Sequence, residues 1–272
     1  MIRQNLHTHS TFGDGKNTCE EIVLSALQKG FLSVGFSEHA YAPYDTDCCI
    51  KQEDIPRYFA EVNRLKKEFA GQIEIFLGFE CDYYCYPERA GLDFTIGSVH
   101  SLFDKASGEY FTIDDTPEAF EQGLNRMAGG DVETFVKIYY RDVADMAHEY
   151  KPDIVGHLDL ITKLNRNNRY FDPKSPWYRR IMRETAGKIA ETGCIVEVNT
   201  GGMSRGVTDM PYPSIEILSE LFDLHVPLTI SSDAHSADSL DFWFSETVEL
   251  LKKTGFRSIK QLTADGFVDV EI

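Results

Sequence analysis

One pattern recurs along the chain: a short apolar run rich in β-forming residues, followed by a longer segment with helical spacing. Seven runs predict strands: Ile2–Leu6, Ser33–Phe36, Glu74–Gly78, Asp93–Gly97, Ile154–Val155, Cys194–Val198 and Pro227–Ile230. Five segments between them predict helices: Cys19–Lys29, Gln52–Ala70, Val132–Tyr150, Trp177–Glu191 and Ser214–Leu224. Repeated βα units favour a mainly parallel sheet and predict an α/β barrel related to the (β/α)8 type.

The 272 residues are expected to form one domain, since α/β barrels of this length are commonly a single unit. The segment at about 102–130 interrupts the pattern with turn residues and acids, which predicts an insertion over one end of the barrel. Asn165–Pro176 predicts another long loop on that face. Such loops usually shape a substrate pocket.

The first predicted helix carries signals for both of its ends. Thr18 is the expected N-cap, with Glu21 three residues later as the partner in a capping box. Gly30 is the expected stop, because glycine tolerates the left-handed backbone that ends many helices.

The charge excludes some partners. With 44 acidic and 27 basic residues the formal net charge is −17, which disfavours binding to the phosphate backbone of nucleic acid.

No apolar run approaches the ~20 residues that span a bilayer, so no membrane partner is expected. The first residues lack the apolar core of a signal peptide, and a cytoplasmic location is expected. The six cysteines fit neither a paired CxxC zinc site nor a disulfide scaffold, and are expected to be reduced thiols.

Histidines and acids gather where the predicted strands end. Nine such positions stand out: His7, His9, Asp14, His39, Glu80, His100, His157, Asp233 and His235. All of them fall after predicted strands, on the face where barrel enzymes assemble their sites. A single histidine after a strand is more often a hydrogen-bonding residue than a metal ligand, but so many on one face predict a shared site. His148, in a helical pattern, and His225, in a turn, are not expected to belong to it.

The residue types indicate the chemistry. Imidazole and carboxylate together suit zinc, iron or manganese, and a carboxylate can bridge two ions. Since one ion needs three or four protein ligands, nine candidates predict two or three ions. Closely spaced ions lower the pKa of a shared water and grip phosphoryl oxygens, which is an arrangement for hydrolysing phosphoesters.

The ordered motifs resemble the PHP (polymerase and histidinol phosphatase) superfamily. The matching runs are His7-Thr8-His9-Ser10, Gly13-Asp14-Gly15, Glu38-His39, Gly78-Phe79-Glu80, Ser98-Val99-His100, Gly156-His157 and Ser232-Asp233-Ala234-His235. Within the superfamily, Ser98–Ser101, the Tyr139-Tyr140 helix and Gly156–Asn165 are similar to the histidinol-phosphate phosphatase branch.

The resemblance implies a distorted (β/α)7 barrel of TIM-like form that holds three divalent ions, with zinc expected first and iron or manganese as alternatives. His7, His9, Glu80 and Asp233 would hold the first ion. Glu80 would bridge to a second ion held by His100 and His157. Asp14, His39 and His235 would hold the third; Asp14 stands where some family members have histidine, which leaves the identity of that ion open.

The implied activity is hydrolysis of L-histidinol phosphate in histidine biosynthesis, by in-line attack of a metal-bridging hydroxide. Arg166 and Arg205 are expected to bind the phosphate, because a guanidinium fork matches two phosphate oxygens. Asp159, two residues beyond His157, is a candidate for orienting a ligand or protonating the leaving group.

Three alternatives stay open. Another PHP phosphoesterase, acting on nucleotides or other small phosphomonoesters, would use the same metal site. A non-catalytic PHP scaffold module should have lost ligands, and none of the nine positions is missing. An amidohydrolase-like barrel would normally show a carbamylated lysine or a mononuclear pattern. The expected partner is therefore a small phosphomonoester, and the sequence allows a homodimer without deciding the oligomeric state.

Overall fold

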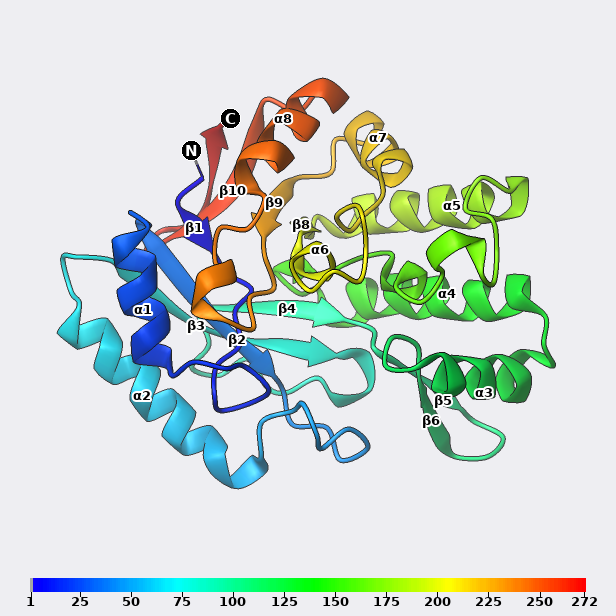
Figure 1. The fold of residues 1–272 in the computed structure, drawn as a ribbon, viewed down its shortest axis with the longest axis horizontal. Helices are drawn as coiled ribbons and strands as arrows, with labels where there is room; N and C mark the ends of the chain where they lie inside the picture. The colour runs from blue at the N-terminus through cyan, green and yellow to red at the C-terminus, as the bar shows by residue number, and fades with distance from the viewer. Residues whose placement is uncertain (1) are drawn as a thin grey trace.

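Seven parallel strands form the centre of the protein, whose residues 2–272 are described by a computed structural model (Figure 1). In sheet order they are β1 (Gln4–Asn5), β2 (Ser33–His39), β3 (Glu74–Asp82), β4 (Phe94–Ser98), β7 (Ile154–Val155), β8 (Ile195–Asn199) and β9 (Leu228–Ser231). A parallel bridge between Thr8 and Ala234 joins the two outer strands and nearly closes the ring. The predicted distorted (β/α)7 barrel is therefore confirmed.

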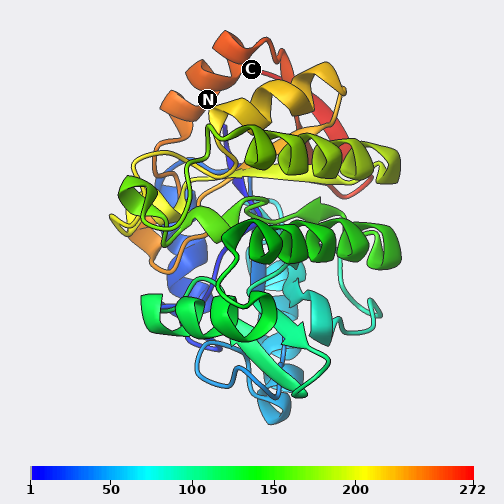
Figure 2. The same cartoon turned by 90° about the vertical axis from the view of Figure 1, so that its right-hand side faces the viewer.

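Helices lie outside this ring (Figures 1 and 2). They are α1 (Cys19–Gln28), α2 (Ile55–Glu68), α3 (Pro117–Ala128), α4 (Val132–Tyr150), α5 (Pro176–Thr192), α7 (Ile215–Asp223) and α8 (Phe244–Thr254). A further short helix, α6 (Gly201–Ser204), lies at the carboxyl ends of the strands, where Gly201 approaches Asp233. Among residues 2–272, none of the helices has the length and apolarity needed to cross a membrane.

The predicted ends of α1 are confirmed. The Thr18 side chain accepts a hydrogen bond from the Glu21 backbone N–H, and the Glu21 side chain accepts one from the Thr18 N–H. At the other end, Gly30 has a φ of +74°. The predicted helix Gln52–Ala70 is divided instead into a 3-10 turn, η1 (Gln52–Asp54), and α2, which has a proline in its first turn.

Residues 102–130 form ordered secondary structure between β4 and α4. A hairpin of β5 (Ser101–Asp104) and β6 (Glu109–Thr112) precedes α3 (Figure 1). The loop Asn165–Pro176 contains one 3-10 turn, η4 (Arg166–Asn168). Three further 3-10 turns are η2 (Tyr83–Cys85), η3 (Leu160–Thr162) and η5 (Ala237–Ser239).

An antiparallel hairpin of β10 (Ser258–Thr263) and β11 (Gly266–Glu271) packs beside β9 and β1 (Figure 1). Leu262 joins a buried apolar cluster made by the strands, whose other members are Leu6, Phe76, Phe94, Ile96, Ile154 and Ile195. The Gln4 side chain donates to the Leu262 carbonyl and accepts from its N–H, at 2.7 and 2.8 Å. The hairpin thereby completes the core at the strand ends opposite the histidines.

Candidate metal centre

All nine predicted ligands converge at the carboxyl ends of the strands. His7 and His9 follow β1, and they are fully buried. The other seven line one pocket above them: Asp14, His39, Glu80, His100, His157, Asp233 and His235. The parallel strands bring these distant sequence positions together because their carboxyl ends share one edge of the barrel.

The predicted first set fits a tetrahedral ion. Nε2 of His7 lies 3.0 Å from Glu80 Oε2 and 3.6 Å from Asp233 Oδ1. Nε2 of His9 lies 3.5 and 3.2 Å from the same two oxygens. A tetrahedral ion with bonds of about 2.0 Å has ligand–ligand edges of about 3.3 Å, close to all four distances.

Three of these atoms also need a partner. Among the described residues, His7 Nε2, His9 Nε2 and Glu80 Oε2 are buried without any hydrogen bond. A buried polar atom left unpaired costs about 1–3 kcal/mol, so such a cluster is unfavourable unless something binds it. The donor set therefore fits a divalent cation.

The second carboxylate oxygen of Glu80 faces a different pair of histidines. Oε1 lies 2.8 Å from His157 Nε2 and 3.3 Å from His100 Nε2. Ser98 Oγ donates to the same oxygen at 2.7 Å. Because its two oxygens face separate imidazole groups, Glu80 has the geometry of a bridging carboxylate.

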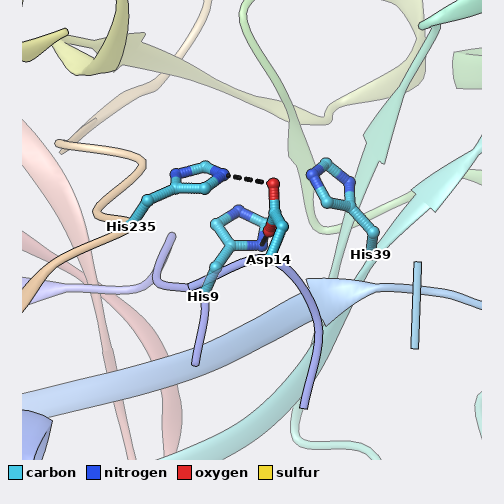
Figure 3. A group of neighbouring side chains, drawn as sticks. All are labelled: His9, Asp14, His39 and His235. Carbon is cyan, nitrogen blue, oxygen red and sulfur yellow. Dashed lines mark hydrogen bonds and ion pairs between the residues drawn. The ribbon is translucent and has the colours of Figure 1, made fainter. Parts of the chain in front are cut away.

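His9, Asp14, His39 and His235 form the third cluster, in which their side chains point toward one another (Figure 3). His235 Nε2 lies 3.0 Å from Asp14 Oδ2, and the His9 and His235 rings stack with centroids 4.3 Å apart. His39 Nδ1 lies 3.0 Å from Glu80 Oε2. The predicted third set is thus joined by His9, and it touches the first set directly.

Burial and mutual charge shift the pKa values of the clustered groups. Burial opposes ionisation of Glu80, but the neighbouring His7, His39 and His100 outweigh it and hold its pKa well below the ordinary value. Burial, together with the charges of His235 and His39, lowers the pKa of His9 to about 3. Glu80 and His9 are therefore in the forms that bind a cation, an ionised carboxylate and a neutral imidazole. Burial opposes protonation of His7 and His100, but neighbouring carboxylates outweigh it and raise their pKa values well above the ordinary value, so a cation would displace a proton from each.

Glu197, on β8, is a functional residue that the sequence did not identify. Its buried carboxylate accepts from His7 Nδ1 at 2.9 Å and from Ser231 Oγ at 2.5 Å. It also accepts from the His157 N–H at 2.7 Å and from Asn199 Nδ2 at 2.8 Å. The bond to Nδ1 leaves Nε2 of His7 free for a metal, the usual role of a carboxylate behind a ligating histidine. An acidic residue inside the apolar run Ile195–Val198 was the available signal.

Asp82 is a second residue near the ligands that the sequence analysis did not identify. It lies two residues beyond Glu80 on β3, and one of its oxygens accepts from the His100 N–H at 2.8 Å. The other accepts from the Tyr44 hydroxyl at 2.9 Å. Asp82 therefore connects the backbone of one ligand to the loop after β2.

Arg205 is the predicted phosphate-binding residue that lines the pocket. It donates to the Asp233 carbonyl at 2.9 Å, and to Asp233 Oδ2 at 2.9 Å. The backbone of Asp233 has a φ of +46°, a conformation that is costly for a non-glycine residue and is found disproportionately at functional sites. Arg205 thus supports a strained ligand as well as facing the pocket.

Two other residues predicted for the site, Arg166 and Asp159, are not among the described residues that line the pocket. The Arg166 side chain is 60 % exposed and pairs with Asp209 at 3.3 Å. Asp159 is buried and accepts from the Ser214 N–H at 2.9 Å, and burial raises its pKa to about 7. Lys163, which belongs to the motif Gly156–Asn165, lines the pocket, and its ammonium group donates to the Asp114 carboxylate at 2.8 Å.

The model of the PHP domain matches residues 5–201. The chain belongs to the PHP domain family. The histidinol-phosphatase of Bacillus subtilis is 29% identical over 272 residues, covering 92% of this chain and 99% of that protein. The family prediction is therefore confirmed, and the predicted branch agrees with the name of this relative.

Two solved structures share the fold of this PHP protein. One is histidinol phosphate phosphatase from Lactococcus lactis in complex with zinc, L-histidinol and phosphate, with a TM-score of 0.73 and 23% identity, covering 98% of both chains. The other, from Listeria monocytogenes, has a TM-score of 0.76 and 23% identity, covering 89% of this chain and 99% of that one.

Proposed function

We propose that this PHP protein is a metal-dependent phosphomonoesterase that hydrolyses L-histidinol phosphate to L-histidinol and phosphate. One observation carries the proposal: the histidine and carboxylate atoms around Glu80 have the spacing of metal-ligand polyhedra and lie in an open pocket. The substrate is supported by the relative from Bacillus subtilis and by the Lactococcus lactis structure, which holds L-histidinol and phosphate.

The proposed cofactors are three divalent ions, with zinc favoured because the Lactococcus lactis structure contains it. His7, His9, Glu80 and Asp233 would hold the first, with Glu80 shared with His100 and His157. Asp14, His39 and His235 would hold the third. Such ions supply positive charge to phosphoryl oxygens and lower the pKa of water.

The protein's own residues perform the remaining work. Arg205 lies at the pocket with its guanidinium fixed by Asp233, so that its unused N–H groups are available to a phosphoryl oxygen. Glu197 holds His7 in one tautomer and ties the His157 backbone to it. We assign Asp159 a positioning role, because its buried carboxylate accepts from the Ser214 N–H and so ties the segment that begins α7 to the loop after His157.

The test is phosphate release from L-histidinol phosphate compared with a panel of nucleotides and sugar phosphates, with metal analysis of the same sample. We expect a kcat/KM for L-histidinol phosphate that exceeds the others by at least about two orders of magnitude, since the site must also match the leaving group. Comparable rates on nucleotides would overturn the substrate. Fewer than two ions per active chain would overturn the multinuclear site.

A further inference from the structure

A second group of potential metal ligands lies at the rim of the pocket, in the loop after β2. It consists of Asp45, Cys48 and Cys49, whose ligand atoms all lie within 4.8 Å of one another. All three side chains are half-buried and line the same pocket as the histidines. None of them belongs to the nine-residue centre, so their proximity has no role in the function proposed above.

Contacts on both sides hold this rim group in place. Before it, the Tyr44 ring stacks on Tyr110 of β6 with centroids 3.8 Å apart, and the Tyr44 hydroxyl donates to Asp82. After it, the Ile50 side chain is fully buried and its N–H donates to the His39 carbonyl at 3.0 Å. Because the loop is already anchored, a cation bound there would require little further ordering of the chain.

The ligand types select a class of cation. Thiolate sulfur favours zinc, cadmium and other thiophilic ions, whereas the imidazole and carboxylate atoms of the main centre also suit manganese or iron. In a tetrahedral zinc site with Zn–S bonds of about 2.3 Å, two sulfurs lie about 3.8 Å apart, a spacing that the rim group can reach. Binding would convert each thiol to a thiolate and release its proton to solvent, and it needs no oxidant.

The other cysteines do not share this arrangement. Cys19, Cys81 and Cys194 are buried, and Cys85 is half-buried but lies outside the group. We propose that Asp45, Cys48 and Cys49 form an accessory site for a thiophilic divalent cation, with a fourth position open to water or to a ligand in the pocket. An ion bound there would lie on the rim of the pocket that a substrate must enter.

The test is titration of the reduced, metal-loaded protein with cadmium. The readout is the ultraviolet charge-transfer absorption of cadmium–thiolate bonds. Only sulfur ligands produce this band, so cadmium exchange at the histidine centre does not contribute to it. We expect a band whose intensity at saturation corresponds to one cadmium bound through two thiolates per chain. It should disappear in the Cys48→Ser/Cys49→Ser double variant. In Asp45→Asn it should remain, with affinity reduced about tenfold or more.

Cys85→Ser is the matched control, because it removes another half-buried thiol near the same loop. It should keep both the band and the affinity of the unaltered protein. Metal content before cadmium addition checks that each variant retains the folded main centre. Absence of the band in the unaltered protein would overturn the proposal. So would a band that persists in the double variant or disappears in Cys85→Ser.

Discussion

Glu80 is the residue through which the clusters of the metal centre are connected. Its Oε2 faces His7, His9 and His39, while its Oε1 faces His100 and His157. A change at this one carboxylate therefore affects several ligand sets at once. For this reason the individual contributions are better tested at residues that support the ligands without belonging to the ligand sets.

Glu197→Gln tests the support of His7. The amide keeps the volume of the side chain, but it lacks the negative charge that stabilises Nδ1–H of His7. We expect metal affinity to fall about 10- to 100-fold, the usual effect of losing a carboxylate behind a ligating histidine. Competition with a chromophoric chelator measures the change. The exposed Glu246→Gln is the control, and equal affinities of the two variants would contradict the role.

Arg205→Ala tests the assignment of the phosphate-binding residue. Loss of the guanidinium removes a donor that faces the pocket and the support of the Asp233 carbonyl. We expect kcat/KM for L-histidinol phosphate to fall about 10²-fold or more. Arg166→Ala, which removes an exposed arginine outside the pocket lining, should have a much smaller effect. Similar losses of kcat/KM in both variants would show that Arg166 also contributes to phosphate binding.

The nine ligand candidates could be predicted because each lies in or after the carboxyl-terminal part of a strand, and the geometry of a parallel barrel brings such positions together whatever their sequence separation. Glu197 and Asp82 act on ligands through hydrogen bonds across different strands. Such partners depend on strand register, which hydrophobic patterning does not specify to the atom. The placement of Arg166 depended on the course of a loop, which the sequence specifies least.

At the scale of elements, Thr18→Ala tests the capping box of α1. The change removes the side-chain oxygen that accepts from the Glu21 N–H. We expect the free energy of unfolding to fall by about 1 kcal/mol, measured by chemical denaturation. Thr18→Ser keeps the oxygen and should retain most of the stability. A full loss in Thr18→Ser would show that packing of the methyl group matters instead.

Gly201→Ala tests the close approach of α6 to a metal ligand. A methyl group at this position would lie 2.8 Å from both Cβ and Oδ2 of Asp233. We expect the Asp233 carboxylate to be displaced and metal content to fall, with a smaller loss of folding stability. Gly187→Ala, where an added methyl group meets nothing within 4 Å, is the control. Unchanged metal content in Gly201→Ala would show that the ligand has room to adjust.

Elements with strong periodicity and clear ends were predicted best. The helix α4 spans the predicted residues 132–150, and α1, α2, α5 and α7 begin and end within a few residues of the prediction. The helices α3, α6 and α8 were not predicted. The hairpin of β10 and β11 was not predicted, because its strands carry few apolar residues and lack a continuous apolar run. The short hairpin of β5 and β6 was not predicted because each strand has only two apolar residues.

For the whole molecule, removal of metal is expected to lower thermal stability. An ion present at 100 times its Kd stabilises the folded state by about 2.7 kcal/mol, so each ion lost should lower Tm by roughly 5–10 °C in a chain of this size. Calorimetry before and after chelation, and after zinc is restored, measures this. An unchanged Tm in a sample shown to have lost its metal would contradict a cluster that needs cations.

The contact between Gln4 and Leu262 joins residues 258 positions apart, and the bridge between Thr8 and Ala234 is also formed by distant segments. Both contacts require nearly the whole polypeptide to be available. The loop-closure entropy of such pairings favours their formation late, after local helices and hairpins. During synthesis, the ring of strands therefore cannot close before the segment around Ala234 has left the ribosome, and the metal centre, which needs Asp233 and His235, cannot assemble earlier.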